Sequence, residues 1–162
     1  MLAELNLFAD YRQIHMFDER SSTDLGEAWT DQAASDRLAI GADAVAIGTE
    51  VSVNVLVGVE VLGSRPADDD AKFDHVVEAS LRSDSGRLVV MGCTDYEPDA
   101  ARFAVPAGWL RLRVAKSNVD QACALGIDSD EVPETMERLR IQVWPAEPTP
   151  AVVVKQWSQP RA

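Results

Sequence analysis

The chain has 162 residues, with 15 lysines and arginines against 27 aspartates and glutamates, which gives a formal net charge of −12 at pH 7. Its length suits one domain, and an apolar fraction of 46% is enough for a packed core. The negative charge excludes non-specific binding to nucleic acid and docking on an anionic membrane, because both need Lys and Arg. We therefore expect a soluble acidic domain whose charged partners are basic.

The start of the chain and its two cysteines favour a cytoplasmic location. The N-terminal segment has no basic stretch, and Glu4 and Asp10 interrupt any apolar run. No run approaches the roughly 18 apolar residues that a membrane-spanning helix needs, so no membrane insertion is expected. Without an export signal, Cys93 and Cys123 are expected to be reduced thiols rather than a disulfide.

The first third of the chain alternates short apolar runs with turn residues, which predicts β-strands. Residues 5–17 carry apolar side chains on both faces, so this strand is expected to bend or bulge near residues 10–13. Residues 28–38 are the best helix candidate, with Thr30 as N-cap. Residues 40–49 and 51–62 are then predicted strands, and a valine occupies every second position from Val51 to Val61.

The later strands follow the same pattern. They are predicted at residues 72–82, 88–93, 102–105, 109–116 and 137–144. On the fourth of these, Trp109, Arg111 and Arg113 share the polar face, so partial exposure of Trp109 is expected. Residues 119–134 are polar and acidic, with room for one helical turn around residues 120–125.

About eight strands and one short helix, with no alternation of strand and helix, predict an all-β fold. A two-layer antiparallel β-sandwich fits this pattern best. We place the sandwich domain at residues 1–145. The Pro-rich segment 146–162 is expected to be a tail that packs on the domain or extends it.

Signatures of enzymes are largely absent from the sequence. No zinc-protease motif, nucleophile elbow, paired Cys-x-x-Cys or P-loop occurs. His15 and His75 lie in predicted strands, where a lone histidine is more often a packed or surface residue than a catalyst. A hydrolase built around one of them is the least favoured hypothesis. We expect no enzymatic activity, no metal and no cofactor.

Acidic residues gather in several predicted loops, at residues 68–70, 95–99 and 128–131. The run at residues 68–70 lacks the alternate spacing and the turn glycine of a calcium loop, and we interpret the other two runs in the same way. The carboxylates are therefore expected to be solvated loop groups. They either serve only solubility or form an anionic face that attracts a basic protein. Trp29 lies on the helix candidate, where it either pins the helix to the sheet or contacts a partner.

Several motifs resemble those of the competence protein J family. Residues 11–14, with the sequence YRQI, followed by Phe17, resemble the opening strand of that family, although Arg12 stands where the family has histidine. Residues 29–33, with the sequence WTDQA, are similar to the family's W-T-D-E-A. Residues 41–61 look like its following strand pair, and residues 103–108 resemble its F-D-L-P-x-G turn. The resemblance covers about residues 5–116, with gaps.

The resemblance implies a small cytoplasmic protein, not an enzyme, that binds and inhibits the nuclease through which DNA enters the cell during competence. The leading hypothesis is therefore a non-catalytic acidic module with a basic protein partner and no direct contact with nucleic acid. The alternative is a β-sandwich that binds a small ligand or a carbohydrate. The candidate partner-binding residues are Asp68, Asp69, Asp70, Asp95, Glu97, Asp99, Trp29 and Asp31.

Overall fold

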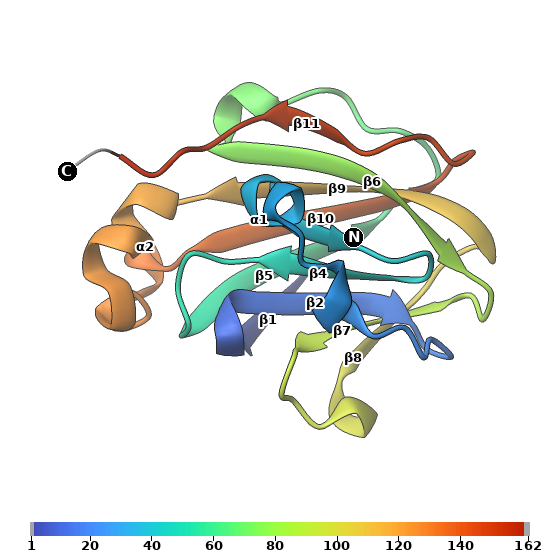
Figure 1. The fold of residues 1–162 in the computed structure, drawn as a ribbon, viewed down its shortest axis with the longest axis horizontal. Coiled ribbons are helices and arrows are strands. Elements are labelled where there is room, and N and C mark those ends of the chain that lie inside the picture. The colour runs from blue at the N-terminus through green and yellow to red at the C-terminus, as the bar shows by residue number, and fades with distance from the viewer. Residues whose placement is uncertain (1, 161–162) are drawn as a thin grey trace.

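A computed structural model describes residues 2–160, which form two β-sheets packed face to face (Figure 1). In order across the first sheet, the six strands are β1 (Leu2–Phe8), β5 (Asn54–Val61), β10 (Arg138–Pro145), β9 (Gly108–Ser117), β6 (His75–Ser83) and β11 (Val152–Lys155). The five strands of the second sheet are β3 (Leu38–Ile40), β4 (Ala44–Gly48), β2 (Gln13–Asp18), β7 (Arg87–Gly92) and β8 (Ala101–Ala104).

The predicted two-layer sandwich is confirmed, but three details of the prediction were wrong. The described residues form eleven strands rather than about eight. They also form two short α-helices, α1 (Asp31–Asp36) and α2 (Val119–Leu125), and several 3-10 turns, so the fold is not strictly all-β. Finally, β10 pairs with β5 in parallel, with Leu139 opposite Val57. Periodicity shows that a segment is a strand, but it does not show which strand will be its neighbour.

The core lies between the two sheets and is built mainly from aliphatic side chains. The valine row of β5 faces inward, and Val55, Val57 and Val59 are fully buried. Ile14 and Met16 of β2 meet this core from the opposite sheet. The period-two alternation of the sequence therefore corresponds here to alternation between the core and the opposite face of each strand.

The predicted first strand is divided between the two sheets. β1 ends at Phe8 and β2 begins at Gln13, and each belongs to a different sheet. A 3-10 turn, Asp10–Arg12, carries the chain across the edge of the sandwich. We call this segment the crossing turn. The expected bend near residues 10–13 is confirmed, and it is a crossing between sheets rather than a bulge within one strand.

The helix α1 is shorter than the predicted 28–38 segment. Thr30 is its N-cap, as predicted, because its hydroxyl accepts the backbone N–H of Ala33 at 3.1 Å. The helix ends at Asp36, since Arg37 takes a left-handed conformation with φ of +59° and Leu38 already starts β3. A separate 3-10 turn, Leu25–Ala28, precedes it. Both segments lie on the outer face of the five-stranded sheet.

The C-terminal segment runs along one edge of the six-stranded sheet. β11 pairs antiparallel with β6, with Val153 opposite Val77. Further on, the backbone N–H of Trp157 donates to Nδ1 of His75 at 3.1 Å, and its indole N–H donates to Asp120 at 2.9 Å. The segment therefore extends the sheet and also packs on it.

Cys93 and Cys123 are separate thiols, as expected. Over residues 2–160, no helix has both the length and the apolar character needed to cross a bilayer.

Candidate partner-binding surface

The crossing turn holds two consecutive non-glycine residues in the left-handed region. Tyr11 has φ of +54° and Arg12 has φ of +57°, a conformation that costs on the order of 1–3 kcal/mol for each residue. Hydrogen bonds hold the turn in place: the N–H of Tyr11 donates to the Asp10 carboxylate and that of Arg12 to the hydroxyl of Ser52, both at 3.1 Å. The Tyr11 side chain is nevertheless 74% exposed. The turn is thus fixed while it presents a tyrosine to solvent.

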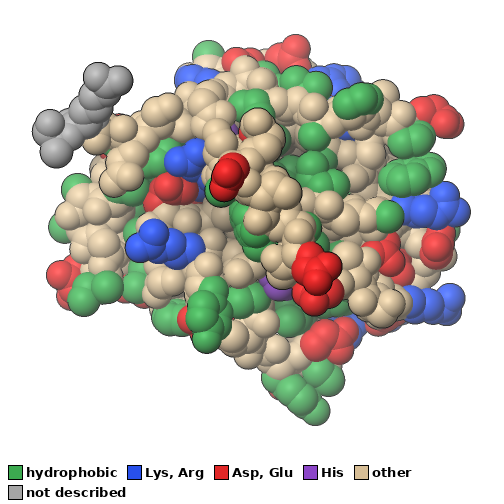
Figure 2. Space-filling view, viewed as in Figure 1, with side chains coloured by type: hydrophobic (Ala, Val, Ile, Leu, Met, Phe, Trp, Pro, Cys, Tyr) green, Lys and Arg blue, Asp and Glu red, His purple; other side chains and the backbone are tan. Residues whose placement is uncertain are grey.

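The loop between β7 and β8 lies against this turn. The Cys93 thiol donates to the backbone carbonyl of Asp10 at 3.2 Å, and the Thr94 hydroxyl donates to the Asp10 carboxylate at 3.0 Å. Tyr96 follows in the same loop and is 71% exposed. In Figure 2, hydrophobic side chains project from the lower tip of the molecule, where Figure 1 has this loop. Two exposed tyrosines therefore stand on connected segments at one end of the sandwich.

Trp29 packs the Leu25–Ala28 segment and α1 onto alanines of the five-stranded sheet. Its indole N–H donates to Oε1 of Gln13 at 3.2 Å. Because an indole nitrogen only donates, the Gln13 atom must be oxygen. Nε2 of His15 lies 2.8 Å from the same oxygen and must therefore carry a hydrogen. Burial lowers the pKa of His15, so the neutral ring with an unprotonated Nδ1 is favoured.

A groove of about 270 Å³ lies between Trp29 and the crossing turn. Tyr11, Gln13, Arg37 and Glu50 are among the residues that line it. Glu50 is paired with Arg37 at 3.1 Å. The WTDQA segment and the YRQI segment, which are separate in the sequence, thus meet at one site.

Below the groove is a buried ion cluster that the sequence did not reveal. The ammonium of Lys116, which is 1% exposed, lies 3.1 Å from Glu50 and 3.0 Å from Glu137. Burial opposes the charge of Glu50, but Lys116 and Arg37 outweigh it, so the pKa of Glu50 is lowered. Burial raises the pKa of Glu137, which is fully enclosed. The one sequence signal that could have indicated this ion cluster is a charged residue at an inward position of a predicted strand, as at Lys116.

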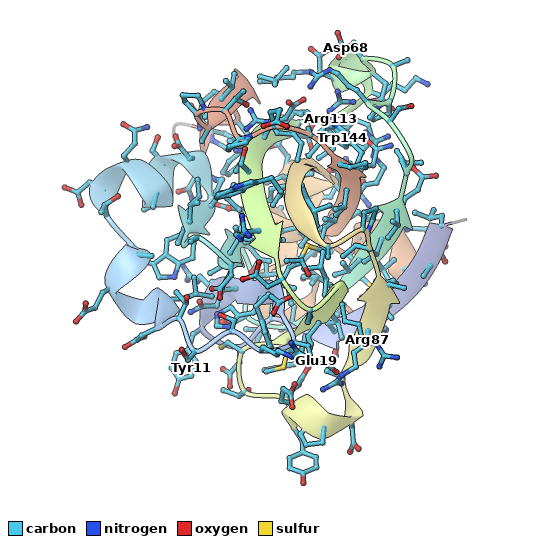
Figure 3. The ribbon with its side chains drawn as sticks, turned by 90° about the vertical axis from the view of Figure 1, so that its right-hand side faces the viewer. Tyr11, Glu19, Asp68, Arg87, Arg113 and Trp144 are labelled. Atoms are coloured by element: carbon cyan, nitrogen blue, oxygen red, sulfur yellow. The ribbon has the colours of Figure 1, made fainter. Side chains whose placement is uncertain are left out.

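The acidic runs at residues 68–70 and 95–99 lie at opposite ends of the molecule and do not form one continuous face. In Figure 3, Asp68 lies with Arg113 and Trp144 at the top, whereas Tyr11 and Glu19 lie at the other end. The β7–β8 loop, which contains the second run, is at the bottom of Figure 1, far from the short turn of the first run beside β11.

The run at Asp68, Asp69 and Asp70 is only partly solvated, because the Asp68 side chain is 78% exposed whereas Asp69 is held by an arginine. Arg140 holds the Asp69 carboxylate through two hydrogen bonds of 2.5 and 2.8 Å, which lower the pKa of Asp69. Asp68 accepts from Arg113 at 3.2 Å. Asp70 begins a 3-10 turn and is half-buried. The reason is long-range, because β9 and β10 place arginines directly under this loop.

Arg113 also belongs to a second ion cluster, on the outer face of the six-stranded sheet. Glu78 accepts from Arg65 at 3.0 Å and from Arg113 at 2.9 Å, and Arg111 lies 3.5 Å away. Burial opposes the charge of Glu78, but these hydrogen bonds outweigh it, so the pKa of Glu78 is lowered. The polar face of β9 is thus covered: Arg111 and Arg113 are buried, and Trp109 is half-buried, as expected.

The remaining candidate residues lie near the crossing turn or the groove. Asp95 and Asp99 are exposed in the β7–β8 loop. The Asp95 carboxylate also accepts the backbone N–H of Gly92, at 2.8 Å. Glu97 is paired with Arg102 at 2.6 Å. Asp31 is the exposed first residue of α1, two positions after the tryptophan that lines the groove. Asp95, Glu97 and Asp99 therefore share the β7–β8 loop with Tyr96, and Trp29 lines the groove beside Tyr11.

His75 is a packed residue rather than an exposed one. It is fully buried, its Nε2 lies 2.8 Å from the carbonyl of Asp36, and its Nδ1 accepts from Trp157. A carbonyl only accepts and an N–H only donates, so the ring is neutral, and burial lowers the pKa of His75. In the described part of the chain, neither histidine is hydrogen-bonded to a carboxylate, and no three side chains are grouped to hold a metal ion.

The molecule is therefore an acidic two-sheet β-sandwich with exposed tyrosines at one end. Two solved structures resemble it. One is ComJ of Bacillus subtilis, an inhibitor of the DNA-degrading activity of NucA, with a TM-score of 0.63 and 13% identity over 90% of this chain and 96% of ComJ. The other is described as crocagin biosynthetic gene J, with a TM-score of 0.60 and 25% identity over 91% of this chain and 98% of the other. No model of a protein family and no curated protein matches the sequence. The chain has a ComJ-like fold, as its motifs predicted.

Proposed function

We propose that this chain is a non-catalytic protein-binding module that binds and inhibits a basic nuclease. The observation that carries the proposal is the likeness to ComJ, which spans 90% of this chain and 96% of the inhibitor. The net charge of −12 supports a basic partner, because the active sites of nucleases are positive to receive phosphate.

The geometry of the candidate site supports binding over catalysis. Both nitrogens of His75 are occupied by backbone groups, and the His15 ring is held by Gln13 and partly buried. The exposed Tyr11 and Tyr96 lie in turns at one end of the sandwich. They are not on a sheet face, where a sugar-binding aromatic platform would be expected, so the ligand-binding alternative gains nothing from them.

An inhibition assay tests the proposal. DNA degradation by purified NucA is measured at rising concentrations of this chain, with ComJ as the positive control. We expect the rate of degradation to fall and to level off once the chain is in molar excess. Added salt should weaken the inhibition, because charges at an exposed interface are screened beyond about 8 Å at 0.15 M ionic strength. Full nuclease activity in excess of this chain at low salt, under conditions where ComJ inhibits, would overturn the proposal.

A further inference from the structure

We propose that the partner binds at the end of the sandwich formed by the crossing turn and the β7–β8 loop, with Tyr11 as the central anchor. We call this the tyrosine end. The inference rests on the proposed function and adds the location and the chemistry of the contact. The occupant is a basic protein surface.

The first argument is the strain at the crossing turn. Tyr11 and Arg12 both have positive φ, at +54° and +57°, although neither is glycine. Core packing does not require these side chains, because both are exposed. Strained residues persist only where surrounding structure holds them, and they gather at functional sites. The chain therefore keeps a tyrosine and an arginine where glycine or asparagine would be less strained.

The second argument is rigidity. The Asp10 carboxylate accepts from the N–H of Tyr11 and from the hydroxyl of Thr94, and the carbonyl of Arg12 accepts from the N–H of Thr49 at 2.9 Å. These bonds tie the turn to the β7–β8 loop and to the residue that follows β4, as well as to its own residues. A turn that is already fixed loses little conformational entropy when a partner binds.

The third argument is the type of side chain that is exposed. Tyr11 and Tyr96 are 74% and 71% exposed, and Phe8, at the end of β1, is 44% exposed. Tyrosine is enriched in binding hot spots because its ring offers a large, stiff contact area with a polar end. Elsewhere in the described chain the large aromatic side chains of Trp144 and Trp157 are packed, although some aliphatic side chains are exposed, such as Ile127 at 82%.

The fourth argument is charge. Asp95 and Asp99 lie beside Tyr96, and across residues 2–160 no lysine or arginine pairs with either of them. The other acidic run differs, because Asp68 and Asp69 already meet Arg113 and Arg140. Unpaired carboxylates beside exposed aromatic rings complement lysine and arginine on a partner. The tyrosine end is therefore an acidic region that is available to a basic surface.

The test replaces Tyr11 with asparagine, which tolerates the left-handed conformation but lacks the ring. Binding to purified NucA is measured by titration calorimetry at low salt. We expect the Tyr11→Asn variant to keep or raise the melting temperature, and its dissociation constant to rise about thirtyfold, the effect of losing a hot spot. The control is Val152→Asn, because Val152 is 51% exposed on β11 at the opposite edge. The control should bind like the wild type.

A second arm tests the charges. The double variant Asp95→Asn/Asp99→Asn should slow association with NucA, because exposed charges act mainly on the encounter. A triple Asn variant of Asp68–Asp70 should not. If wild type binds and Tyr11→Asn binds equally well, the tyrosine end is not the contact surface, and the proposed function stands. If only the triple variant binds more slowly, the contact lies at the opposite end and the inference is wrong. If wild type does not bind NucA, the inference falls together with the proposed function.

Discussion

Replacing Lys116 with methionine tests whether the ion cluster below the groove holds the fold together. The Lys116 ammonium lies 3.1 Å from Glu50 and 3.0 Å from Glu137, and the residue is 1% exposed. Methionine has a similar length but no charge, so the change leaves the fully buried Glu137 without its cation, while Arg37 still pairs with Glu50. Removing one partner of a buried ion pair costs about 3–5 kcal/mol. That is a large part of the roughly 5–15 kcal/mol by which a domain is stable.

Urea unfolding at neutral pH, followed by tryptophan fluorescence, measures this change. Lys72→Met is the matched control, because Lys72 is exposed, and it should stay within about 0.5 kcal/mol of wild type. Adding Glu137→Gln to Lys116→Met should recover part of the lost unfolding free energy, because the second change removes the carboxylate that Lys116→Met leaves without its cation. A double variant no more stable than Lys116→Met would show that the loss comes from packing rather than charge.

The loss of unfolding free energy in the Lys116→Met variant should become smaller as the pH falls. Burial raises the pKa of Glu137 in the folded protein, so folding favours the protonated form of this carboxyl group. The contribution of Glu137 to stability therefore declines as the pH rises. Without Lys116 its chief cationic neighbour is gone, and protonation at mildly acidic pH removes the unpaired charge. A Lys116→Met variant within about 1 kcal/mol of wild type at neutral pH would refute the reasoning, because a stranded buried carboxylate costs more than that.

Three further changes test other contacts. Trp29→Ala should lower the free energy of unfolding by about 2–3 kcal/mol in urea, because its ring is only half-buried; an unchanged value would show that Trp29 does not pin the helix. Asp69→Asn should cost about 1–2 kcal/mol, because it weakens the bidentate contact with Arg140, whereas equal stability would mean that this pair is only superficial. Burial opposes the charge of Asp18, but hydrogen bonds from serine hydroxyls and backbone N–H groups outweigh it, so the pKa of Asp18 is lowered. Its contribution is present above the unfolded pKa of about 3.9 and is lost as the pH falls through the folded value. Asp18→Asn should therefore destabilise the fold by about 1–3 kcal/mol at neutral pH, and thermal melts should show the difference narrowing in acid; a difference independent of pH would contradict this account.

Local sequence patterns determined the strands, their inward faces and the first helix. A valine at every second position placed Val55, Val57 and Val59 in the core, because side chains of a strand alternate between faces. Thr30 capped α1 as predicted, since an N-cap needs only a side-chain oxygen and the next turn of backbone. The resemblance of the motifs around residues 11–14 and 29–33 to the competence protein J family also predicted a ComJ-like fold.

Tertiary structure decided which polar residues are free and which are paired. Asp68 and Asp95 look alike in sequence, yet Asp68 meets an arginine 45 positions away whereas Asp95 stays at an exposed end. Likewise the parallel pairing of β10 with β5 brings together strands that are far apart in the chain. Alternation fixes the face on which a side chain lies, but it carries no information about the neighbouring strand. The charge that a loop presents to a partner is therefore a property of strand order, which only the folded chain shows.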